Sequence, residues 1–336
     1  MAFSPPCSVP WSPTSSSPLS RGSVGFEGRF DWTKDAEPTS SGRLSTPGLD
    51  FVSPAGAVKG LKGDIAFTSL TPLVTAPNQR LTADSLSAGA EVTALDLTFS
   101  IDQAGVVIDG ARFVAGGGTV SVEPLTVPLD ATQPYSGVIV LDRVQLGDLI
   151  ADSGFDDKVL LDAVVSGRLP FIMDPESGLK ITAGRLEAVQ PGRLSIKREV
   201  LTDVAASGGG EEVSENMVED LAYQAMENLS FDQLSAEVNS LDGGRVAVLF
   251  HIRGRHDPPR RQELRLTLSE LISRSFLNRK LPLPSDTRID LTLDTTLNAN
   301  QLISDLMAVN RARQGQQAQD ESAPQAAPAP VPAGRP

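Results

Sequence analysis

Hydrophobic and polar residues alternate along much of the chain. In the most regular run, Leu95, Leu97, Phe99 and Ile101 are interleaved with Asp96, Thr98, Ser100 and Asp102. Similar runs cover residues 246–252, 264–268 and 289–297, and less regular ones occur at 24–32, 65–67, 120–122, 138–141, 169–171, 181 and 194–196. Because successive side chains of a β-strand point to opposite faces, this period of two predicts half-buried strands.

Glycine residues fall between many of these runs, for example Gly105, Gly110, Gly137, Gly184 and Gly192. We interpret them as turn residues, because glycine accepts the backbone angles that tight turns require. Strands joined by such turns predict a mainly β protein, in which an antiparallel sheet meanders and has one apolar face. The spacing of the runs is irregular and does not indicate a solenoid repeat.

Two segments follow a helical period instead. Residues 214–229 carry an apolar side chain at every fourth position: Met217, Leu221, Ala225 and Leu229. Residues 300–313 carry a similar stripe, and a shorter helix is expected at 146–151. We therefore expect two or three short amphipathic helices packed against the sheet.

The two ends of the chain differ from this middle part. Residues 1–20 contain five prolines and seven serines, and residues 313–336 consist mainly of Gln, Ala and Pro. Such sequences bury too little apolar surface to offset the entropy of ordering, so both ends are predicted to be disordered. The β-rich domain is expected to span residues 21–312. The first twenty residues also lack the basic start and apolar run of a signal peptide.

Composition argues against several classes of protein. The 336 residues carry a formal net charge of −13, which repels phosphate backbones, so no nucleic-acid partner is expected. No run of 18 or more apolar residues is present, so we expect no transmembrane segment in this chain. The single cysteine, Cys7, excludes an internal disulfide and a cysteine-based zinc site.

The sequence contains no recognisable catalytic constellation. The two histidines, His251 and His256, lie five residues apart on a strand-to-turn path, share no face and are interpreted as surface or turn residues. The glycine triplets at 116–118 and 208–210 lack the Lys-Ser/Thr of a phosphate loop. We therefore predict a non-enzymatic protein with no catalytic residue, no metal site and no cofactor.

Basic residues are concentrated in one stretch of this acidic chain. Residues 253–265 include Arg253, Arg255, Arg260 and Arg261. Because arginine binds phosphate and carboxylate groups with two parallel hydrogen bonds, these four are candidates for contact with an anionic lipid head group. The alternative is a solvated loop whose charges protect a sheet edge from aggregation.

Several short motifs, taken in order, resemble one known family. Residues 105–130 read GVVIDGARFVAGGGTVSVEPLTVPLD, residues 167–194 contain G-R-L-P, then G-L-x-I-x-x-G-x-L, then P-G-x-L, and residues 231–258 lead to the corner Gly254–Pro258. Over about residues 100–306 the chain resembles the YdbH-like branch of the AsmA/TamB-related bacterial envelope proteins, and the similarity is weaker over 22–100. The corner departs from the family's G-R-N-P-like pattern at His256 and Asp257.

The resemblance implies an elongated, curved antiparallel sheet with an apolar concave face. It also implies a periplasmic protein, anchored in the inner membrane in its full-length relatives, that passes phospholipids between membranes. We expect the chain to correspond to the C-terminal part of such a protein, without the family's anchor and upstream region. The domain also carries the label "dicarboxylate transport", but a permease would need membrane-spanning segments, which this sequence does not show.

Apolar positions of successive strands are candidates for lining the implied groove. They are Ile108, Val120, Val122, Val138, Val140, Leu169, Phe171, Ile181, Ile196, Val248 and Phe250. Phospholipid acyl chains are the expected partner of this face, since an apolar sheet face must be covered. A closed β-sandwich would cover the face equally well, so a structural or docking module with an envelope protein partner is the alternative function.

Overall fold

The computed structural model describes residues 20–32, 38–53, 56–88, 90–151, 159–196, 223–263 and 282–298. Within these residues, eighteen strands form one antiparallel sheet. The strands are β1 Arg21–Asp31, β2 Thr39–Ser53, β3 Gly56–Leu70, β4 Leu73–Thr75, β5 Gln79–Ala88, β6 Ala90–Ile101, β7 Gly105–Ala115, β8 Gly118–Val122, β9 Leu125–Pro128, β10 Tyr135–Gln145, β11 Val159–Asp162, β12 Val164–Asp174, β13 Gly178–Ile181, β14 Gly184–Ala188, β15 Gly192–Ile196, β16 Leu229–Leu241, β17 Arg245–His256 and β18 Arg288–Asn298.

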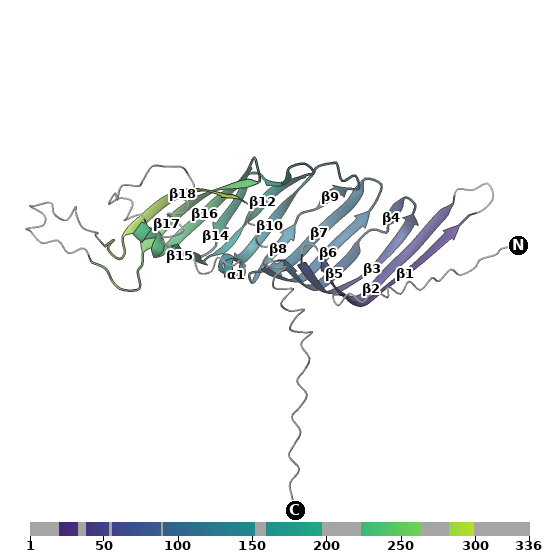
Figure 1. Ribbon diagram of the computed structural model, residues 1–336, viewed down its shortest axis with the longest axis horizontal. Helices are drawn as coiled ribbons and strands as arrows, with labels where there is room; N and C mark the ends of the chain where they lie inside the picture. Colours follow the sequence, from purple (N-terminus) through teal and green to yellow (C-terminus); the bar gives the residue numbers. More distant parts are fainter. Residues whose placement is uncertain are drawn as a thin grey trace, which may run out of the picture.

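Most long strands pair with the next long strand in the sequence. Pairing runs through β1, β2, β3, β5, β6, β7, β8, β10, β12, β14, β16, β17 and β18, always antiparallel. Figure 1 shows these strands side by side along the long axis, from β1 at one end toward β18 at the other. The predicted meandering antiparallel sheet is confirmed. The closed β-sandwich considered as an alternative is not found, because the described strands belong to one open sheet.

The helices agree with the prediction only in part. A helix, α1 (Leu146–Ala151), forms where the short helix was expected. Of the helix predicted at 214–229, the described part is helical at 223–227, but Leu229 already belongs to β16. An apolar residue such as Leu229 fits a helical stripe as well as a strand, so the stripe did not show where the helix ends and β16 begins. The helix predicted at 300–313 and the strand at 264–268 lie outside the described residues. The same holds, except for Ser20, for the disorder predicted for residues 1–20 and 313–336.

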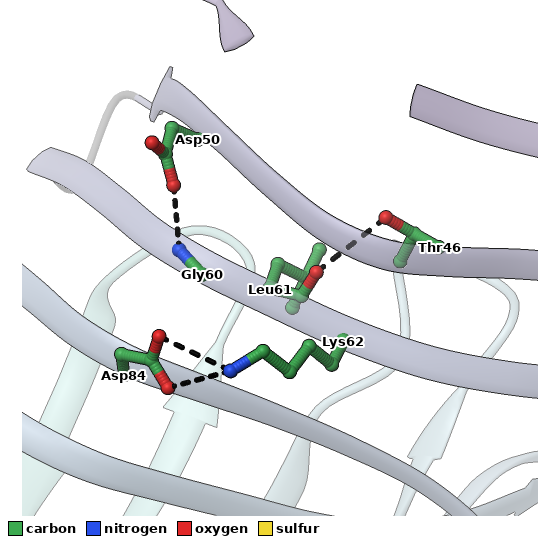
Figure 2. Close-up of polar contacts among 6 residues, drawn as sticks. All are labelled: Thr46, Asp50, Gly60, Leu61, Lys62 and Asp84. Carbon is green, nitrogen blue, oxygen red and sulfur yellow. Dashed lines mark hydrogen bonds and ion pairs between the residues drawn. The ribbon is translucent and has the colours of Figure 1, made fainter. Parts of the chain in front are cut away.

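A bulged region joins β2, β3 and β5. The register between β2 and β3 shifts twice over residues 46–51. Oδ1 of Asp50 accepts a hydrogen bond from the Gly60 amide at 2.7 Å, and Lys62 forms an ion pair with Asp84 at 3.1 Å (Figure 2). Gly60 has φ +64°, and a Cβ there would lie 2.0 Å from Oδ2 of Asp84, so this position requires glycine. Bulges of this kind bend and twist a sheet.

Several glycines interpreted as turn residues lie inside a strand or at its first position. Gly137 is the third residue of β10, and Gly184 and Gly192 begin β14 and β15. Each is overlain by an apolar side chain of an adjacent strand. A Cβ at Gly192, for example, would lie 2.5 Å from Cζ of Phe231. The physical reason for these glycines is therefore the close approach of a neighbouring side chain rather than a turn.

Candidate functional site: one apolar face of the sheet

The apolar side chains of neighbouring strands form a continuous row on one face of the sheet. Residues paired across antiparallel strands point to the same face, so the register identifies this row directly. From β5 to β12 it consists of Leu81, Leu97, Ala111, Val122, Ile139 and Leu169. From β14 to β18 it continues through Leu186, Ala236, Phe250 and Leu293. We call the face that carries this row the apolar face.

Nine of the eleven groove candidates lie on the apolar face. Val122, Leu169 and Phe250 belong to the row itself. The other six are paired with, or alternate with, members of this face: Ile108, Val120, Phe171, Ile181, Ile196 and Val248. Val120, Phe171 and Val248 are buried, and the remaining six are half-buried.

Val138 and Val140 do not belong with the other candidates. Val138 is paired with Pro170, and Val140 with Ser121 and Arg168, all on the opposite face. Among residues 138–141, the side chains that reach the apolar face are Ile139 and Leu141, neither of which was among the candidates. Residues 138–141 are all apolar, so their sequence carries no alternation from which the face of each residue could be assigned.

The opposite face, which we call the polar face, is lined by ion pairs. Four of them join neighbouring strands: Arg43–Asp64, Lys62–Asp84, Arg80–Asp96 and Arg253–Asp290. A fifth joins Arg168 of β12 to Glu123, which follows β8. The hydrogen bond from Arg80 holds the pKa of the Asp96 carboxyl below its ordinary value. These side chains are largely exposed, so solvent screens each pair and each contributes little to stability. Their main consequence is that this face is solvated.

Side-chain exposure on the apolar face changes along the sheet. Near β16 and β17 the face is closed by its own side chains, and Leu229, Phe231 and Ile252 are 1%, 0% and 1% exposed. Across β7 to β12 the row is half-buried. At the β1 end, Phe26 and Phe30 are 56% and 55% exposed. A ligand of this face therefore has more open apolar surface to contact away from the β16–β17 cluster.

The arginine candidates lie apart from the apolar face. Arg253 and Arg255 alternate with Ile252 and Gly254 on β17 and so point to the polar face. There, Arg253 is paired with Asp290, and a shallow depression of about 560 Å³ is lined by Asp232, Arg253, Arg255, Asp286, Arg288 and Asp290. Arg260 and Arg261 are exposed in the loop after β17. A head group bound by Arg253 and Arg255 would therefore lie on the face opposite to the apolar row.

His256 is buried, contrary to the prediction of a surface or turn residue. It ends β17, pairs with Leu229 and is 1% exposed. Neither ring nitrogen has a hydrogen-bond partner among the described residues. Burial lowers the pKa of His256. The Gln262 side chain and the Asn228 backbone act in the opposite direction and raise this pKa more weakly. His251, by contrast, is exposed on the polar face, with Nδ1 3.2 Å from Oγ1 of Thr292.

No group of three or more His, Cys, Asp or Glu side chains that could hold a metal ion occurs in the described part of the chain. In the same residues, no helix is long and apolar enough to cross a membrane.

These features define the class of protein: an open, one-sided antiparallel β-sheet with a continuous apolar row on one face and ion pairs on the other. The chain belongs to the YdbH-like family. The model of this family, described as "Intermembrane phospholipid transport protein YdbH", matches residues 12–269. This match confirms the resemblance found in the sequence motifs and identifies the family as one of phospholipid transport. No curated protein and no solved structure matches the chain.

Proposed function

We propose that the chain is a non-enzymatic, lipid-binding and lipid-conducting module of a YdbH-like intermembrane phospholipid transport protein in the bacterial envelope. The observation that carries this proposal is the apolar row from Leu81 to Leu293, which crosses the sheet without a charged residue. The family match supports phospholipid as the cargo.

The dimensions of the sheet suit acyl chains. Strands are about 4.8 Å apart, and one leaflet of a bilayer core is roughly 15 Å thick, so an acyl chain lying along the row covers about three strands. The row extends from β5 to β18, which provides several such lengths end to end. Each buried CH₂ contributes about 0.8 kcal/mol, so a single acyl chain gains enough free energy to leave water.

Lipid and solvent contact different faces of the sheet. Acyl chains occupy the apolar face, while the ion-paired polar face stays in contact with water. In this arrangement the module works in the periplasm, between the inner membrane that anchors full-length relatives and the outer membrane. Its partners are phospholipid acyl chains, and no catalytic residue or cofactor takes part.

The proposal is tested with two adjacent residues of β10. Ile139 and Val140 are both half-buried, but Ile139 belongs to the apolar row and Val140 is paired with Arg168 on the polar face. We expect Ile139→Asp to remove most of the phospholipid that native mass spectrometry detects on the purified protein, because it places a charge in the path of the acyl chains. Val140→Asp should retain the lipid, since its new carboxylate lies beside an arginine.

Far-UV circular dichroism and thermal unfolding establish that both variants are folded. If Ile139→Asp does not fold, Val122→Thr, which is nearly isosteric, replaces it and should reduce lipid occupancy more weakly. The proposal fails if the unmodified protein carries no phospholipid after exposure to phosphatidylglycerol vesicles. It also fails if both carboxylate variants lose lipid to the same extent.

A further inference from the structure

At one edge of the described sheet, β1 is a long, exposed strand with aromatic side chains on its apolar side. All eleven residues of β1 are exposed, and among the described residues β1 pairs only with β2. Val24, Phe26, Phe30 and the adjoining Trp32 are 50%, 56%, 55% and 77% exposed. Figure 1 shows β1 at one end of the elongated sheet.

This edge has some of the usual protections against strand addition and lacks others. Natural edge strands are short, or carry proline, charged side chains (lysine above all), a β-bulge or an inward-pointing charge. β1 carries charged side chains on its polar side and a register shift between Ser23 and Gly25. However, it is eleven residues long, has no proline and no lysine, and the positions that face the apolar side, Phe26, Gly28 and Phe30, carry no charge. Unpaired backbone groups and exposed aromatic rings on one strand indicate a surface that another strand covers.

The sequence of β1 is complementary to itself when a second copy runs antiparallel about Gly28. In this register, Glu27 lies opposite Arg29 of the copy, and Phe26 lies opposite Phe30 of the copy. Each contact occurs twice because of the two-fold symmetry. Cross-strand pairs of opposite charge and of aromatic residues are the pairs that stabilise antiparallel sheets.

Neighbouring registers are less favourable. A shift that places Glu27 on the two-fold axis sets it opposite its own copy, and the shift to Arg29 does the same for two arginines. Like charges directly opposite each other destabilise a strand pair. A shift by one residue places aromatic rings opposite charged side chains, because it reverses the face of every residue.

We propose that two copies of this chain associate edge to edge through β1, antiparallel about Gly28. Because the two-fold axis is perpendicular to the sheet, Phe26 and Phe30 of both copies lie on the same side, and the two apolar faces become one surface. The association follows from the edge itself and does not depend on the ligand of the apolar face.

The test uses two charge reversals that are complementary to each other. Sedimentation velocity of the full chain over a range of protein concentrations should show a monomer–dimer equilibrium. Glu27→Arg and Arg29→Glu should each weaken the dimer by roughly tenfold or more, because each replaces two attractive pairs with two repulsive ones. An equimolar mixture of the two variants should restore a heterodimer, since the reversed charges then face each other.

Glu187→Arg and Arg112→Glu, which make the same charge changes at exposed positions of β14 and β7, should leave the dimer unchanged. Circular dichroism verifies that all four variants are folded. A chain that remains monomeric at every concentration overturns the proposal and leaves the edge to a strand of another protein. A dimer that tolerates both reversals, or a mixture that does not recover, also overturns it.

Discussion

The fully buried side chains of the apolar face at β16 and β17 allow a direct test of how much burial on this face stabilises the protein. Leu229 is 1% exposed and belongs to a cluster with Val165, Phe231 and Ile252. Replacing a fully buried leucine by alanine removes its transfer free energy and leaves a cavity, at a cost of about 2–5 kcal/mol. We expect Leu229→Ala to fall in the upper half of this range, because a side chain with so little exposure leaves a cavity that solvent cannot fill without further opening.

The matched control is a second leucine in the same region. Leu160 of β11 is paired with Ser195 on the polar face and is 59% exposed. Complete burial of a leucine side chain stabilises a protein by about 1.5–3 kcal/mol. Less than half of the Leu160 side chain is buried, so Leu160→Ala should lower the free energy of unfolding by about 1 kcal/mol or less. Urea unfolding followed by circular dichroism measures the free energy of unfolding of both variants. An m-value equal to that of the unmodified protein verifies that the same surface is exposed on unfolding. Equal losses for the two variants would refute the assignment of the buried cluster to the apolar face.

Two further predictions concern Gly192 and His256. Gly192→Ala should destabilise the protein by about 1–3 kcal/mol, because its Cβ would lie 2.0 Å from the Asp162 carbonyl oxygen and 2.5 Å from the Phe231 ring. Gly110→Ala, with nothing within 4 Å, should be neutral or stabilising in the same urea titration. The folded-state pKa of His256 is lowered, so its neutral form stabilises the fold above the unfolded-state pKa of about 6.5, and this contribution is lost as the pH falls below that value. Thermal unfolding from pH 7.5 to 5 should therefore show a decline in stability that His256→Asn reduces. An identical pH dependence in the two proteins would contradict the assignment.

The strands were predictable because alternation records which residues a sheet buries. The run 95–101 lies within β6, and the runs 246–252 and 289–297 lie within β17 and β18, which are neighbours in the sheet. Alternation does not assign a side chain to a face where odd- and even-numbered positions of a strand are both apolar. At residues 138–141 the partners in β8 and β12 decide the face, and those partners are known only from the register.

The burial of His256 was not predictable for a related reason. Its local sequence, with Arg255 before it and Asp257 and Pro258 after it, is typical of a solvated corner. The residue is buried because β16 places Leu229 opposite it and because the backbone of residues 286–287 hydrogen-bonds to it. Both contacts are distant in sequence. Glycines such as Gly192 show the same limitation, since only the position of Phe231 distinguishes a site of close approach from a turn.

The separation of the arginines from the apolar row bears on how a conducting sheet would work. Hydrophobic contact is non-directional and proportional to area, so an acyl chain that moves along a row of similar side chains exchanges one set of contacts for an equivalent set. A cluster of arginines on the same face would bind the phosphate group strongly at one point and would slow release. In this sheet, Arg253 and Arg255 lie on the polar face, and the depression there contains three aspartates as well as three arginines. The apolar row from Leu81 to Leu293 is therefore free of a charged side chain that would hold a lipid at one place, as the proposed conduction along the sheet requires.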